Sequence, residues 1–216
     1  MNPYGRTDLV SSGGSIIAIA LDAGYGSHEA FADCSGITPG GLRSQQSIAT
    51  LDLMEPFEMN MDMIVPLAAP RMEERAAFRV VGLGIDCAFG NTGAIPALWQ
   101  AFDAREDEFE NAVAGALYGV CCMGDGAGNF RYIAGIEAEG LPPGMEHIDM
   151  PAHRYAVFTH SGHISDFAKT VYTIWNKALP AAGLKSAPAP DFERYDHRFD
   201  GRTGLGEVEI WIPIVS

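Results

Sequence analysis

The chain of 216 residues has little of what secreted and membrane proteins depend on. Its four cysteines have no regular spacing, and the neighbours Cys121 and Cys122 point to opposite faces if they lie in a strand. No apolar run approaches the roughly 20 residues that cross a bilayer. The short apolar stretch at 16–21 also lacks the basic residues that precede a signal-peptide core. We therefore expect free thiols, a cytoplasmic location and no membrane partner.

Positive charge is scarce as well. Lys and Arg total 14 against 28 Asp and Glu, which gives a formal net charge of −14. This balance opposes contact with phosphates, so nucleic acid is a doubtful partner, and it suits cationic or neutral ligands. A solvated acidic surface explains the same charge without any partner.

Common motifs for cofactors, metals and nucleophilic catalysis are missing. The glycine-rich stretch 124–129 precedes no helix and no Gly-Lys-Ser/Thr, so it is not a phosphate-binding loop, and the chain has no Gly-x-Ser-x-Gly elbow. His160 and His163 have only Asp166 nearby as a third metal ligand, whereas zinc typically takes three or four ligands. We predict no metal and no cofactor, and we expect turn and helix-capping roles for these histidines.

The chain does contain one order of elements that occurs twice. Apolar residues three and four apart indicate helices, and alternating or β-branched runs indicate strands. Each copy reads strand, helix, strand, strand, the first over 77–88, 95–105, 116–123 and 130–139, and the second over 153–160, 163–179, 191–196 and 207–213. The repeat predicts an α+β fold of duplicated β-α-β-β units related by a pseudo-twofold axis. A groove between the two halves is the expected place for a ligand.

Two strings near the C-terminus carry a resemblance to a known family. They read Asp191-Phe-Glu-Arg-Tyr-Asp196 and Glu207-Val-Glu-Ile-Trp-Ile-Pro213, and they follow the strand and helix at 153–183. Residues 77–216 as a whole resemble the GyrI-like small-molecule-binding domain, which is also the effector-binding part of drug-sensing transcription activators. The resemblance implies an SHS2-type fold, and it puts Glu193, the glutamate of the D-F-E-x-Y string, in a ligand pocket.

The residues around Glu193 favour recognition of a cation. The strand pleat puts Glu193 on the same face as Tyr195. A carboxylate among aromatic rings attracts an organic cation through charge and cation–π contacts. The same surroundings raise a carboxyl pKa and suit a general acid or base. The plainer alternative is an exposed glutamate that pairs with Arg194 or Arg202.

Aromatic residues are the other candidates for the groove, although most such residues are more often part of a core. Trp175 and Tyr132 are the first choices, because a helix and a central strand flank the expected groove. The remaining candidate ligand-binding residues are Tyr172, Tyr195, Trp99, Tyr118 and, as a second carboxylate, Glu209.

The N-terminal region resembles a different family. Residues 15–43, with the closing Gly-x-Thr-Pro string at 36–39, resemble the second helix-turn-helix of AraC-type transcription regulators. The first helix-turn-helix of that family is missing, the interval between Phe31 and Gly36 is about one helical turn short, and Asp33 stands where a basic residue is expected. Arg43 is the only basic residue of this region, against three acidic ones, which is the wrong sign for a DNA-facing helix. We interpret 1–45 as a truncated helix-turn-helix remnant, 46–75 as a linker and 76–216 as the GyrI-like domain.

The resemblance implies three functions. The one we favour is a protein that binds hydrophobic, cationic or planar small molecules, either as the effector domain of an AraC-type regulator or as a stand-alone derivative. The second is a GyrI-like hydrolase that detoxifies reactive, ring-containing (cyclopropanoid) natural products, with Glu193 as the catalytic residue. The third is a DNA gyrase inhibitor-like protein. A homodimer is left open.

Overall fold

The computed structural model describes residues 59–88, 91–109, 112–124 and 128–215. From Asn60 onward the chain forms one compact unit. The predicted helix-turn-helix remnant at 1–45 lies outside the described residues, as does the first part of the predicted linker. None of the helices in the described ranges is long and apolar enough to cross a membrane.

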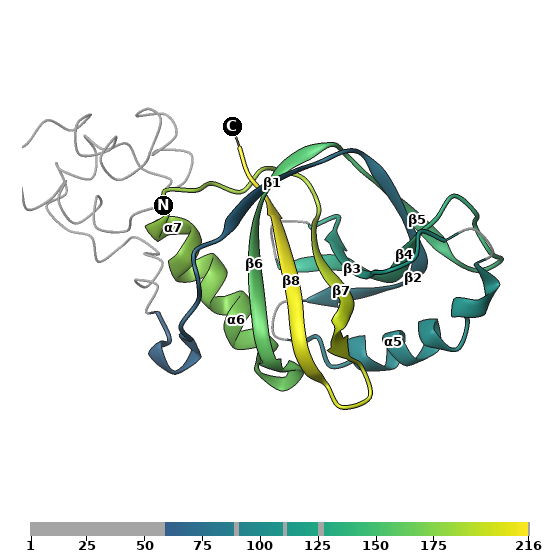
Figure 1. Ribbon diagram of the computed structural model, residues 1–216, viewed down its shortest axis with the longest axis horizontal. Helices are drawn as coiled ribbons and strands as arrows, with labels where there is room; N and C mark the ends of the chain where they lie inside the picture. The colour runs from purple at the N-terminus through teal and green to yellow at the C-terminus, as the bar shows by residue number, and fades with distance from the viewer. Residues whose placement is uncertain (1–58, 89–90, 110–111, 125–127, 216) are drawn as a thin grey trace, which may run out of the picture. The chain divides into compact units, whose positions relative to one another are not determined.

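In the described part of the chain, eight antiparallel strands form a single curled sheet, a half-barrel with few helices (Figure 1). Their order across the sheet is β1-β6-β8-β7-β3-β4-β2-β5. The strands are β1 (Arg71–Arg75), β2 (Phe78–Ala88), β3 (Leu117–Cys122), β4 (Asn129–Glu137), β5 (Glu146–Met150), β6 (His153–His163), β7 (Asp191–Asp200) and β8 (Leu205–Pro213).

The strand order reads the same outward from the central pair of β3 and β7. On one side follow β4 and β2, and on the other side follow β8 and β6, which are the matching strands of the two predicted copies. The outermost strands, β1 and β5, are exchanged between the copies: β1 precedes β2 in the chain but pairs with β6, and β5 precedes β6 but pairs with β2. Each copy therefore completes the sheet of the other, which ties the two halves together.

Two helical segments cover different halves of the sheet (Figure 1). Helix α5 (Ile95–Asp103) begins with a proline in its first turn, which suits a helix start, and it buries Leu98 and Phe102 against β2 and β4. The second segment runs through η3 (Ile164–Asp166), α6 (Phe167–Thr173), the π-helical η4 (Ile174–Ala178) and α7 (Leu179–Ala181), and α6 contacts β6. Short 3-10 turns, η1 (Met61–Met63) and η2 (Glu106–Glu108), complete the described elements.

The apolar residues form cores on both faces of the sheet. One cluster takes residues from strands at both ends of the order, such as Met150 of β5 and Tyr155 of β6, which requires the sheet to curl around it. We call this side the concave face. Alternate residues point to the opposite side, the helix face, where separate clusters form under α5 and under α6. The alternation follows from the pleat: Val80 lies in the concave cluster, and Val81 lies under α5.

Candidate ligand-binding site

Glu193 lies on the helix face of the central strand β7, where two phenols hold its carboxylate. The hydroxyls of Tyr132 and Tyr195 each donate a hydrogen bond to Glu193 Oε2, both at 2.7 Å. Trp99 of α5 donates from Nε1 to the Tyr132 hydroxyl at 3.1 Å, and its ring meets the Tyr195 ring edge-on at a centroid distance of 5.1 Å. Four of the predicted site residues are thus brought together by α5, β4 and β7.

Gly119 of β3 makes room for this arrangement. It pairs directly with Glu193 across the two central strands. A Cβ atom at position 119 would overlap the Tyr132 hydroxyl and lie 2.6 Å from Glu193 Oε2. Only the absence of a side chain therefore allows Tyr132 to reach across β3 to the carboxylate.

Asp191 supplies a second carboxyl on the same face, two residues before Glu193. Its partner across the strands is Cys121. Burial, together with repulsion from Glu193, raises the pKa of Asp191 to about 7. Burial also raises the pKa of Glu193, although its hydrogen bonds from Tyr132 and Tyr195 act in the opposite direction. Among the residues that the structure describes, neither carboxyl has an ion-pair partner.

Comparison with known proteins shows the family to which this fold belongs. Residues 68–215 match the GyrI-like small molecule binding domain. The chain belongs to this family. "Transcriptional regulator BrlR" of Pseudomonas aeruginosa is 39% identical over 154 residues, which are 67% of this chain and 54% of BrlR. "Probable transcriptional regulator YgiV" of Escherichia coli K12 is 32% identical over 90 residues, 39% of this chain and 56% of YgiV.

The chain thus spans about half the length of the curated relatives it matches. Among solved structures, SAV2435 bound to tetraphenylphosphonium aligns with a TM-score of 0.58 at 16% identity, over 69% of this chain and 95% of SAV2435. This likeness shows a shared fold.

Two predicted residues of the GyrI-like domain, Tyr118 and Glu209, lie on the concave face and not with Glu193. The reason is the strand register, because both residues stand opposite Arg194, whose side chain alternates with that of Glu193. The Tyr118 hydroxyl accepts a hydrogen bond from Arg75 at 2.9 Å. These two residues therefore face away from Glu193, and their part in a groove between the halves stays a prediction.

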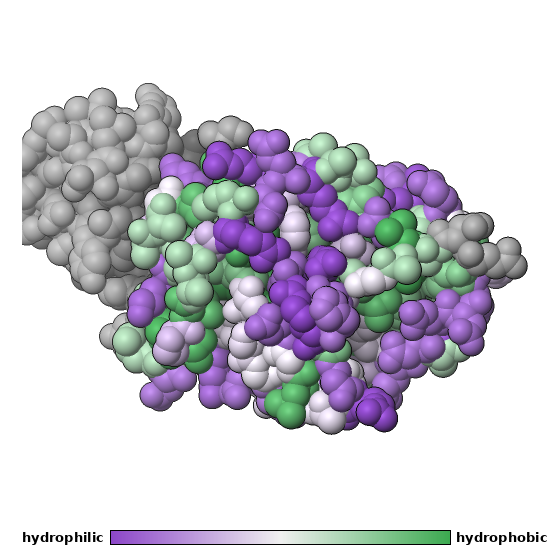
Figure 2. Space-filling model, in the orientation of Figure 1, coloured by the Kyte–Doolittle hydropathy of each residue, from purple (hydrophilic) through white to green (hydrophobic). Residues whose placement is uncertain are grey.

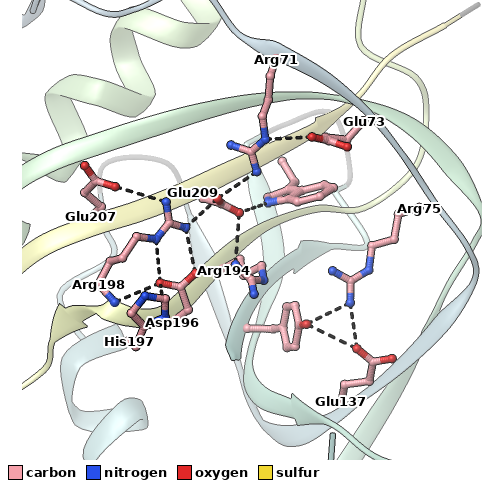
Figure 3. A network of polar contacts seen from close by, with 12 residues as sticks. Arg71, Glu73, Arg75, Glu137, Arg194, Asp196, His197, Arg198, Glu207 and Glu209 are labelled. Atoms are coloured by element: carbon pink, nitrogen blue, oxygen red, sulfur yellow. Dashed lines mark hydrogen bonds and ion pairs between the residues drawn. The ribbon is translucent and has the colours of Figure 1, made fainter. Parts of the chain in front are cut away.

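Glu209 instead sits at the centre of an arginine–carboxylate network on the concave face (Figure 3). Its side chain is 5% exposed, and its carboxylate accepts hydrogen bonds from Arg71, Arg194 and Arg198 and from the indole of Trp211. The residues drawn over β7 and β8 in Figure 2 are mainly hydrophilic, in keeping with this network. Burial raises the pKa of Glu209, but Arg198, Trp211 and Arg71 together lower it below the ordinary value, so the carboxylate is charged and already compensated.

The two other aromatic candidates, Tyr172 and Trp175, come from the second helical segment. The Tyr172 hydroxyl accepts a hydrogen bond from the Asn60 amide at 2.8 Å, so it contacts the start of the compact unit. Trp175 lies in the π-helical turn and is 40% exposed. Neither is a hydrogen-bond partner of Glu193, and their part in a groove between the halves stays a prediction.

The histidines have the structural roles that their spacing suggests. His163 Nδ1 accepts a hydrogen bond from the backbone amide of Ser165 and so caps η3. His160 is buried, with one ring nitrogen 2.8 Å from the Thr170 hydroxyl and the other 3.2 Å from the His163 carbonyl, and burial lowers the pKa of His160. In the described ranges no three His, Cys, Asp or Glu side chains are grouped to hold a metal ion.

Sequence reasoning missed Asp191 and Gly119. The signal for Asp191 was present, because a residue two positions from Glu193 in a strand must share its face. Gly119 gave no such signal, because its role depends on the register between β3 and β7.

Proposed function

We propose that this GyrI-like domain binds hydrophobic organic cations at Glu193 and acts as the small-molecule-sensing part of a transcription regulator. The observation that carries the proposal is the state of the Glu193 carboxyl. It is partly buried, it is held by two phenols, and in the described part of the chain no cation pairs with it.

Among the described residues, Glu193 differs from Glu209 in having no arginine partner, and this difference supports the proposal. Both carboxyls are withdrawn from water on central strands, yet Glu209 has three arginines and Glu193 has none. Removing a carboxylate from water is costly unless an opposite charge compensates it. A cationic ligand would supply that charge for Glu193, and the rings of Trp99 and Tyr195 at its side offer cation–π contact and apolar area.

The regulatory part of the proposal is supported by the relatives. BrlR and YgiV are both named as transcriptional regulators, and the family is a small-molecule binding domain. We infer that ligand binding at Glu193 is the signal and that another segment acts on DNA. An AraC-type origin for residues 1–45 stays a prediction.

A binding experiment with a hydrophobic cation tests the proposal. Tetraphenylphosphonium, the ligand in the SAV2435 structure, is titrated calorimetrically into the full chain and into Glu193→Gln. We expect saturable binding by the wild type and a loss of affinity of about tenfold or more in the variant, because a charge-assisted contact disappears. Glu207→Gln removes the same charge from the concave face, where Glu207 pairs with Arg198, and should leave the affinity unchanged. An unchanged affinity in Glu193→Gln would refute the placement of the cation.

The hydrolase alternative makes a separate prediction. It requires that a reactive cyclopropane-bearing compound be converted to a water-addition product, with Glu193 acting as general acid or base. Under the binding proposal the compound is recovered intact after long incubation, and product formation that is lost in Glu193→Gln would favour the hydrolase.

A further inference from the structure

We infer that Asp191 is a specificity-determining residue, which adds a second carboxyl to the Glu193 site and makes it prefer ligands with two cationic groups over ligands with one. The inference rests on the proposed function, because it takes Glu193 to be the place where a cation binds.

The strand geometry fixes the spacing of the two carboxyls. Asp191 and Glu193 are two residues apart on β7, so their side chains leave the same face about 7 Å apart, the repeat of a pleated strand. Phe192 between them is fully buried on the concave face, where it stacks on Trp211 at a centroid distance of 5.3 Å. Because Phe192 cannot turn out of that core, the two carboxyls cannot leave the helix face.

The neighbouring strand places small residues beside both carboxyls, and the room at Gly119 is taken by the Tyr132 hydroxyl. The residues of β3 that face Asp191 and Glu193 are Cys121 and Gly119, which are small. The Cys121 thiol adds no negative charge to the site, because burial and the two carboxyls raise its pKa and keep it neutral.

The charges of β7 are sorted between its two faces. Arg194 and Arg198 point to the concave face, where they pair with Glu209 and with Asp196. The helix face of the same strand therefore has the carboxyls of Asp191 and Glu193 and neither of these arginines. Tyr132, Tyr195 and Trp99 form a hydrogen-bonded frame that orients one of the two carboxyls.

Ligand charge should control the protonation of this pair. The titratable groups facing Asp191 are Glu193 beside it and Cys121 opposite it, and the phenols of Tyr132 and Tyr195 face Glu193. Without a second cationic group beside it, Asp191 titrates around its pKa of about 7. A second cationic group favours the ionised form, so a dication should bind with release of a proton.

Two matched probes separate these cases. Methyl viologen and N-methyl-4-phenylpyridinium share a planar biaryl frame, but the first carries a cation at each end and the second at one end only. Calorimetric titration of the full chain at pH 8 should show that the dication binds about tenfold more tightly or better. Asp191→Asn should abolish this preference, so its loss of affinity should be about tenfold larger for the dication than for the monocation, whereas Glu193→Gln should weaken both probes. Glu207→Gln is the control for net charge.

A measurement on the wild type alone covers the case in which a variant fails to fold. The ratio of dication to monocation affinity should rise between pH 6 and pH 8, around the pKa of about 7 for Asp191. Equal affinities for both probes, a ratio that does not change with pH, or an equal effect of Asp191→Asn on both probes would overturn the inference. If neither probe binds the wild type, the proposed function fails as well.

Discussion

Replacing Asp191 with asparagine should stabilise the ligand-free domain, and increasingly so as the pH rises. Asp191 has a higher pKa in the folded chain than the ordinary value of 3.8, mainly because it is buried and secondly because Glu193 repels it. The folded state therefore binds this proton more tightly than the unfolded state does. Both states are protonated below the unfolded pKa of 3.8. Folding loses stability as the pH rises from that value to about 7, and the effect stays constant above it.

The size of the effect follows from the two pKa values. The difference between 3.8 and about 7 corresponds to about 4 kcal/mol at 1.4 kcal/mol for each pH unit. Asp191 is partly exposed, and solvent reduces the penalty, so we expect about 2 to 4 kcal/mol. Asparagine has nearly the same shape as aspartate, but its side chain does not titrate. The stability gained by Asp191→Asn should thus grow by this amount between pH 4 and pH 8.

Urea unfolding followed by tryptophan fluorescence measures this gain. All three tryptophans, Trp99, Trp175 and Trp211, lie in the compact unit, so the signal reports on this domain alone. Comparing wild type and variant at each pH cancels the other titrating groups. A stability difference that is independent of pH, or that shrinks as the pH rises, would refute the burial and repulsion assigned to Asp191.

Two further predictions concern the two faces of the sheet. Glu209→Gln should lower the free energy of unfolding by about 3 to 5 kcal/mol, because it leaves arginines without their buried partner. Urea unfolding measures this loss of stability. A loss below about 1 kcal/mol, typical of exposed ion pairs, would contradict the prediction. Gly119→Ala should weaken tetraphenylphosphonium binding about tenfold, because the new methyl group separates Tyr132 from Glu193. Calorimetry checks this prediction, and unchanged affinity would show that the phenol does not position the carboxylate.

Local pattern was enough to predict most elements of the fold. The strands and helices of both copies occur within a few residues of the predicted bounds, because each buries one face and its apolar spacing shows it. The strands β1 and β5 were not predicted from the sequence. Each has five residues, and β1, which reads Arg-Met-Glu-Glu-Arg, carries almost no apolar signal, since its stability comes from pairing with β6.

The site was predictable only as far as one strand could be read by itself. The pleat gives the shared face of Glu193 and Tyr195 directly, and the family resemblance pointed to Glu193. Which face of a neighbouring strand meets that site depends on register, and a shift of one residue exchanges the two faces. For this reason Tyr118 and Glu209 were assigned to the groove, although the observed register puts them on the concave face.

A crystal structure of the full chain with tetraphenylphosphonium tests the central claim most directly. The account predicts the phosphonium on the helix face of β7, against Glu193, with the rings of Trp99 and Tyr195 at its edge. A phosphonium bound on the concave face, beside Arg75 and Glu209, would contradict it.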